Sequence, residues 1–217
     1  MRVARDRHLV SIVQVDEIHP RKLGILTTLV AVLAIAVLAV AAAELINYGF
    51  GDRITALDAG SDEGVFGTAG DIALAAAALS AWVLAARSGS ARPVPVVLAG
   101  LLTFLAVDNI ASLHDHIPHW LGFYLPVLAA AFICLVVVAR SSSEGSRFWL
   151  IGAGLLLLAL SLFLHVFGMR LLLDLGFSDT GGWAYQIKAV VKHGTEVAGW
   201  FLVVLGLLQL GLREPGA

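Results

Sequence analysis

The sequence predicts an all-α protein, a polytopic transmembrane bundle of six helices with both termini in the cytoplasm. Composition is the first reason: hydrophobic residues make up 59% of the chain and charged residues 14%, against roughly 45–50% and about 25% in soluble domains. The second reason is that the apolar residues fall into six runs of about 20 residues, the length that crosses a bilayer. The third is the uneven distribution of basic residues between the two sides of these runs.

Short polar or Pro- and Gly-containing loops separate the six runs. They span about Gly24–Asn47, Phe66–Ala86, Val96–Leu113, Trp120–Ala139, Phe148–Leu171 and Tyr185–Leu212. A basic leader (1–23) precedes the transmembrane domain (24–212), and a short tail (213–217) follows it. The first run is too long for a signal-peptide core, so we expect it to be retained as an anchor.

Basic residues give the predicted orientation. Ten of the 14 lysines and arginines fall on the side of both termini and four on the other side. Because cytoplasmic loops carry the excess of basic residues, both termini are predicted to lie inside, in a multi-pass protein of the cytoplasmic membrane. Five aromatic residues are expected to form a belt at the outer surface: Tyr48, Trp120, Tyr124, Trp183 and Tyr185. The partner is then the lipid bilayer, and a net charge of -2 without a Lys/Arg run excludes nucleic-acid binding.

The chemically densest stretch, residues 108–119, ends the third predicted span. Its sequence, DNIASLHDHIPH, holds five ionisable side chains. If the helix continues through it, Asp108, Ser112 and Asp115 share one face. An intramembrane carboxylate such as Asp108 is a functional-site hypothesis by default. This stretch therefore predicts a polar site near the outer membrane surface.

Polar residues of other spans lie at a similar predicted depth. At about 1.5 Å per residue, Asp71, Asp108 and His165 each lie roughly 7 Å below the outer ends of their spans. His193 and Glu196 begin at nearly the same level if the last 20 or so residues of the long sixth helix cross the core. We therefore predict that Asp108, His165, His193 and Glu196 converge on one site.

Acidic residues at the outer ends of the odd-numbered spans are electrostatically misplaced. Glu44, Asp108 and Asp115 lie at or just beyond C-terminal helix ends, where the helix dipole disfavours negative charge by a few tenths to about 1 kcal/mol. A cation would explain them. The candidates are a bound metal, a protonated histidine, or Lys192, which is spaced i, i+4 from Glu196.

Imidazoles and carboxylates without cysteine ligands suit a divalent transition metal, zinc first. The candidate ligands are Asp108, His114, Asp115, His165, His193 and Glu196, of which Asp108 and Glu196 are also candidate catalytic groups; the supporting residues are Glu44, Asp71, Ser112, Ser161 and Lys192. Simpler interpretations compete at two of these positions: Asp71 as a favourable acid in a first helical turn, and His165 as a bundle histidine bonded to the Ser161 hydroxyl or to a carbonyl.

Three functions fit this set of residues. Metal-dependent hydrolysis of a lipid-like substrate is the first prediction, because a catalytic zinc needs three protein ligands and an open position for water. A metal-ion or proton transporter or sensor is the alternative, in which the same groups titrate. A bis-histidine haem site is the third, and it would leave the carboxylates unexplained. The almost wholly apolar inner halves of the spans favour a one-sided site over a transport route.

One stretch resembles a known motif. Asp108-Asn109, four residues, and then His114-Asp115 are similar to the D-E-x-x-x-x-H-E motif of an uncharacterised group of bacterial and archaeal multi-pass membrane proteins. Further similarities are an acidic loop with Glu63-Gly64, a second span of small residues, and a late helix with Glu196 and Gly199. Asn109 and Asp115 stand where the motif has glutamates. The resemblance implies a multi-pass membrane fold and carries no activity.

A fainter resemblance is to the seven-span superfamily of alkaline ceramidases and receptor-like membrane hydrolases. It implies an intramembrane zinc held by histidines. The paired C-terminal histidines of that superfamily are missing here, since His193 stands alone. The resemblance is therefore an analogy with the predicted chemistry.

Overall fold

The computed structural model describes residues 20–52, 54–58, 64–88, 93–117, 120–141, 145–177 and 182–212. Six long helices occupy these ranges: α1 (Pro20–Gly49), α2 (Val65–Ser88), α3 (Pro93–Ala111), α4 (Trp120–Arg140), α5 (Gly145–Asp174) and α6 (Trp183–Gly211). Two short 3-10 helices, η1 (Thr55–Leu57) and η2 (Leu113–His116), follow α1 and α3. The described part of the chain contains no strand, which confirms the all-α prediction.

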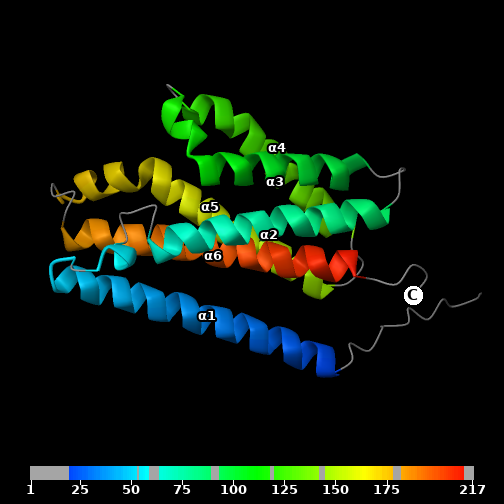
Figure 1. The fold of residues 1–217 in the computed structure, drawn as a ribbon, viewed down its shortest axis with the longest axis horizontal. Coiled ribbons are helices and arrows are strands. Elements are labelled where there is room, and N and C mark those ends of the chain that lie inside the picture. The colour runs from blue at the N-terminus through cyan, green and yellow to red at the C-terminus, as the bar shows by residue number, and fades with distance from the viewer. Residues whose placement is uncertain are drawn as a thin grey trace, which may run out of the picture.

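All six helices are long and apolar enough to cross a membrane, as predicted, and the chain has the architecture of a multi-pass membrane protein. Figure 1 shows that α1 begins and α6 ends at the same end of the bundle. We call this the terminal end and the other the distal end. The cytoplasmic placement of the terminal end stays a prediction. The leader up to residue 19 and the tail 213–217 lie outside the described residues.

The prediction of one continuous helix through residue 113 is wrong. The α3 helix ends at Ala111, and Ser112 has a φ of 48°, in the left-handed region that stops an α-helix. The 3-10 turn η2 then follows in a new direction. Asp115 therefore does not share a helical face with Asp108, because the regular spacing that the prediction assumed is interrupted between them.

The α6 helix is the centre of the bundle. It packs against α5, α2 and α1, while α2 also packs against α3, and α4 bridges α3 and α5. Close contact between α5 and α6 depends on glycine: a Cβ on Gly154 would lie 2.8 Å from the carbonyl oxygen of Gly199, and a Cβ on Gly206 would lie 2.5 Å from Cγ1 of Ile151. Small residues allow helix backbones to approach in this way within membranes.

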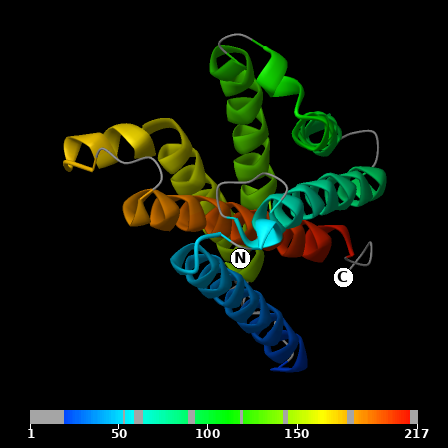
Figure 2. The same ribbon diagram turned by 60° about the vertical axis from the view of Figure 1, so that its left-hand side comes forward.

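The α1 helix packs mainly against one other long helix, α6. Its main contacts are with α6 and η1, and in Figure 2 it stands away from the α3–α4 side of the bundle. Asn47 fixes the following turn, because its Nδ2 donates to the carbonyl oxygens of Ile54 (3.0 Å) and Leu57 (3.1 Å) and its Oδ1 accepts from the Ile54 N–H (2.9 Å). The Tyr48 ring packs edge-on against Trp183.

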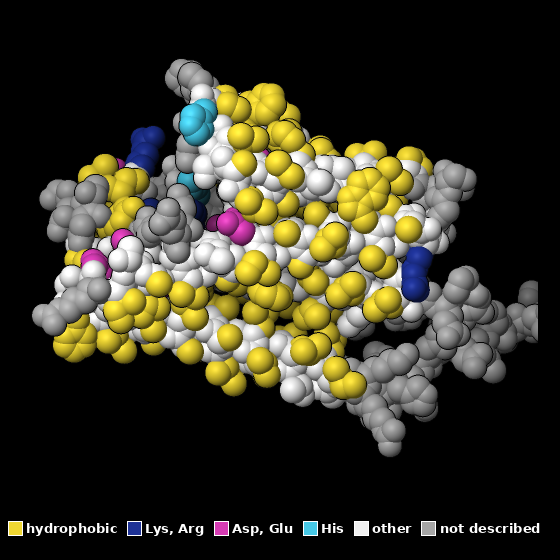
Figure 3. All heavy atoms as spheres, in the orientation of Figure 1, with side chains coloured by type: hydrophobic (Ala, Val, Ile, Leu, Met, Phe, Trp, Pro, Cys, Tyr) yellow, Lys and Arg dark blue, Asp and Glu magenta, His cyan; other side chains and the backbone are white. Residues whose placement is uncertain are grey.

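The surface agrees with a membrane environment. Figure 3 shows hydrophobic side chains along the length of the visible face, while acidic and histidine side chains gather toward the distal end. Large apolar side chains are exposed along the helices, among them Ile35, Leu38, Leu79 and Leu156. Such a surface is stable when lipid covers it.

Candidate functional site

A cavity of about 850 Å³ lies between α2, α3, α4, α5 and α6. Leucines from all of these helices except α6 form much of its wall: Leu74, Leu105, Leu128, Leu155 and Leu158. Polar side chains enter it from the last turn of α3, the early turns of α2 and α4, and the distal halves of α5 and α6. The cavity therefore combines apolar walls with a polar region in the distal half of the bundle.

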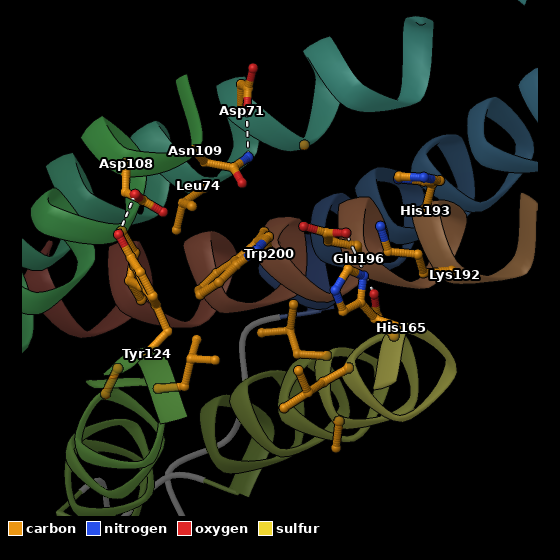
Figure 4. A pocket seen from close by; sticks show the side chains of 18 of the residues that line it. Asp71, Leu74, Asp108, Asn109, Tyr124, His165, Lys192, His193, Glu196 and Trp200 are labelled. Carbon is orange, nitrogen blue, oxygen red and sulfur yellow. Dashed lines mark hydrogen bonds between the residues drawn. The ribbon is translucent and has the colours of Figure 1, made fainter. Parts of the chain in front are cut away.

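One polar group comes from α2, α3 and α4. The Asn109 Nδ2 donates a hydrogen bond to Asp71 Oδ1 (2.5 Å), and the Tyr124 hydroxyl donates to Asp108 Oδ1. Asp108 is 5% exposed and Tyr124 3% exposed, so their contact is well shielded from solvent. Both pairs are visible in Figure 4. In each pair the hydrogen-bond donor is a neutral group. It orients the carboxyl group but does not neutralise the negative charge of an ionised carboxylate.

The second polar group comes from α5 and α6. The Ser161 hydroxyl donates to Glu196 Oε2 at 3.5 Å, the long end of the hydrogen-bond range. In Figure 4, His165, Lys192 and Glu196 lie close to one another on the facing sides of these two helices. Helical spacing explains this arrangement, because His165 lies one turn beyond Ser161, and Lys192 one turn before Glu196.

Aromatic side chains lie between the two polar groups. Figure 4 shows Trp200 on α6 between the Asp108 and Glu196 sides of the cavity. Trp120 lies against both sides as well: its ring centroid is 5.4 Å from that of His165 and 6.0 Å from that of Tyr124. The polar groups are thus separated by rings rather than merged into one cluster.

The four residues predicted to converge, Asp108, His165, His193 and Glu196, all line this cavity. So do four of the predicted supporting residues, Asp71, Ser112, Ser161 and Lys192. Glu44 is not among the lining residues and is buried elsewhere, on α1. His114 and Asp115 have a described backbone, in η2, but their side chains lie outside what the structure describes.

Within the described ranges, no three His, Cys, Asp or Glu side chains are grouped so that they could hold a metal ion. The two polar groups explain this, because Asp108 lies with Tyr124, and Glu196 lies across Trp200 with His165. A catalytic zinc needs three protein ligands, so the described side chains do not form a metal centre in this arrangement. Zinc stays a prediction that depends on His114 and Asp115.

Sequence reasoning missed the roles of Tyr124, Trp120 and Trp200. The prediction placed Tyr124 in a surface belt, whereas the structure buries it against Asp108. The sequence did contain a signal for this contact. Asp108 lies a few residues before the hairpin between α3 and α4, and Tyr124 lies about as many residues after it. Trp200 offered no signal, because an aromatic residue in an apolar run looks like ordinary packing.

Comparisons with protein-family models, with curated proteins and with solved structures found no match to this chain. The resemblances to the motif-bearing membrane group and to the ceramidase-like superfamily therefore rest on the residues alone.

Proposed function

We propose that this protein binds a lipid-like amphiphile inside the membrane, with the polar head of the ligand between the two polar groups of the cavity. The observation that carries this proposal is the cavity itself. Its volume, about 850 Å³, lies in the usual range of ligand pockets, roughly 300–1,000 Å³. Leucine walls suit a hydrocarbon chain, and a few placed polar side chains suit one head group.

The charges of the lining favour a cationic head, such as an amine. The described lining carries three acidic residues, Asp71, Asp108 and Glu196, and one lysine, Lys192. A positive charge is attracted more strongly to carboxylates in a low-dielectric cavity than in water. The aromatic ring of Trp200 between the acidic residues adds a favourable cation–π surface. An anionic head group would be repelled by the three acidic side chains of the lining and attracted by one lysine.

The terminal half of the bundle closes the cavity on one side. Its core is apolar and almost fully buried, with Leu98, Leu102, Ile151, Val203 and Leu207 each at 0% exposure. A transporter needs a polar or open route through the membrane. This closely packed apolar core supports a one-sided binding site in preference to a transport path.

Hydrolysis of the bound amphiphile remains the predicted reaction. Asp108 and Glu196 both line the cavity, and a carboxyl group placed beside a ligand can act as a general acid or base. The head group would lie between them. Metal analysis of the purified protein tests zinc dependence separately: stoichiometric zinc that is lost in His114→Ala would support it, and metal-free protein that retains activity would exclude it.

The binding proposal is tested with two single-chain amphiphiles of equal chain length, one with an amine head and one with a carboxylate head. Each is titrated against the protein in nanodiscs, with a fluorescent amine amphiphile as the displaced ligand and empty nanodiscs as the blank. We expect the amine to bind more tightly. Asp108→Asn keeps the shape of the side chain but removes its charge, and it should reduce the preference by about tenfold, equivalent to about 1.4 kcal/mol.

Asp174→Asn is the matched control, because Asp174 is exposed at the distal end of α5 and does not line the cavity. It should leave the preference unchanged. Equal binding of both head groups to the wild type, or the same loss in Asp174→Asn as in Asp108→Asn, would rule out the proposed head-group site.

A further inference from the structure

A second buried carboxyl group lies outside the cavity. The Glu44 side chain, near the distal end of α1, is 2% exposed. Neither Oε1 nor Oε2 has a hydrogen-bond partner among the described residues. Buried polar groups nearly always have a partner, so a buried carboxyl with two unbonded oxygens needs an explanation.

Apolar side chains of α2 and α6 pack against α1 in this region. A cluster of Phe66, Val190 and Val197 packs against side chains of α1, which include Val37, Val40, Ala41 and Leu45. The helices come close here, since a Cβ on Gly194 would lie 3.3 Å from Cγ1 of Val37. Asn47, one turn after Glu44, cannot supply a donor as placed, because its amide is bonded to Ile54 and Leu57. Within the part of the chain that the structure describes, the carboxyl group is thus buried without a polar partner.

No lysine or histidine of α6 neutralises Glu44 among the described residues. Lys188 lies with its Nζ 4.6 Å from the Tyr185 ring centroid and its stem along Gly168 of α5. Lys192 and His193 line the cavity instead.

Of the described charged groups, Asp58 is the one that acts on Glu44; it follows η1 and has the same sign of charge when ionised. An ionised carboxylate is therefore strongly disfavoured at this position.

We propose that Glu44 is a proton-binding site between α1 and α6. The neutral carboxyl group is buried when α1 is docked, and loss of its proton loosens this contact. The contact with α6 is the main attachment of α1 to the other long helices. Proton binding at Glu44 therefore stabilises the docked position of α1, independently of whether the cavity binds an amphiphile.

Thermal unfolding in detergent at several pH values, from about 5 to about 9, tests this through proton linkage. A group that binds its proton more tightly in the folded state stabilises the fold at low pH, and this stabilisation is lost as the pH rises. We expect the melting temperature of the wild type to fall with rising pH and that of Glu44→Gln to change much less. Asp174→Asn should keep the wild-type slope. Equal slopes for the wild type and Glu44→Gln would overturn the proposal.

Labelling of the unmodified protein provides a second measurement, which does not depend on a variant that folds. A hydrophobic carbodiimide reacts with protonated carboxyl groups and leaves an adduct that mass spectrometry can locate. The adduct at Glu44 should decrease as the pH rises, by up to about tenfold per pH unit once the group ionises. Labelling should be the same in sodium and choline chloride. Labelling that is absent at every pH, or that sodium suppresses, would overturn the proposal, the latter in favour of a bound metal cation.

Discussion

The two halves of the bundle differ in how they use buried space. The terminal half is closely packed: Gly154 and Gly199 bring α5 and α6 into backbone contact, and Ile151 packs against Gly206. The distal half contains most of a cavity of about 850 Å³, into which polar side chains project. Unfilled space and buried polar groups both reduce stability unless a ligand uses them. The contrast indicates that the terminal half stabilises the fold and the distal half binds the ligand.

Gly154→Ala should have the largest effect on stability, because it breaks the terminal half. The new Cβ would lie 2.8 Å from the Gly199 carbonyl oxygen and 3.0 Å from Cγ2 of Val203, so the helix backbones must separate. Overpacking typically costs about 1–3 kcal/mol and occasionally more, and we expect the upper end here because the clash is with a backbone atom. Thermal unfolding in detergent measures the loss.

Gly152→Ala is the matched control, two residues away on the same helix. Its Cβ would meet nothing within 4 Å, and alanine favours a helix over glycine by roughly 0.5–1 kcal/mol. The variant should be as stable as the wild type or slightly more stable. If both alanine variants unfolded at the same temperature, close α5–α6 packing would not be what stabilises this half.

Tyr124→Phe should have an intermediate effect, this time in the distal half. It removes the hydroxyl that donates to the buried Asp108 carboxyl and leaves the ring in place. The loss of a donor to a buried polar group costs roughly 1–3 kcal/mol. In an Asp108→Asn background, Tyr124→Phe should reduce stability by less, because the Tyr124 hydroxyl then donates to an uncharged side chain.

Tyr185→Phe is the control for Tyr124→Phe. It removes a hydroxyl from a tyrosine at the start of α6 and keeps the ring that Lys188 contacts. Its unfolding temperature should match the wild type. A loss as large as that of Tyr124→Phe would show that the Asp108 contact has no special importance.

Asn109→Ala should have the smallest effect of the three. The hydrogen bond from Asn109 to Asp71 joins α3 to α2 at half-buried positions, and a typical hydrogen bond contributes about 0.5–1.5 kcal/mol. Binding of an amine amphiphile should change as well, because the Asp71 carboxyl loses the donor that orients it. A change in stability with unaltered affinity would place the Asn109–Asp71 pair outside the binding site.

The sequence was sufficient to predict the six helices, since each is a long apolar run with polar ends. Counting residues along each helix also led to the prediction that Asp108, His165, His193 and Glu196 lie at a similar depth, and all four line the cavity. Depth does not determine which way a side chain faces around the helix axis. Glu44 was therefore listed among the supporting residues of the site, although it is buried on α1 and does not line the cavity.

The end of α3 could not be predicted for a different reason. Nothing in the stretch from Asp108 to Asp115 is a strong helix breaker, and the left-handed conformation of Ser112 becomes visible only in the folded chain. The division of the polar residues into two groups was also unpredictable, since it depends on where the rings of Trp120 and Trp200 lie.

The most direct test of the central claim is to locate the bound amphiphile. A photoactivatable amphiphile with an amine head is crosslinked to the protein in nanodiscs, with and without excess unlabelled amine amphiphile, and the adducts are mapped by mass spectrometry. We predict protectable labelling at Leu105 and Leu158, which line the cavity. Leu156, two residues from Leu158, is 74% exposed and should show only labelling that excess ligand does not suppress. Labelling confined to Leu156 and other exposed positions, without protection at Leu105 or Leu158, would contradict an amphiphile site inside the bundle.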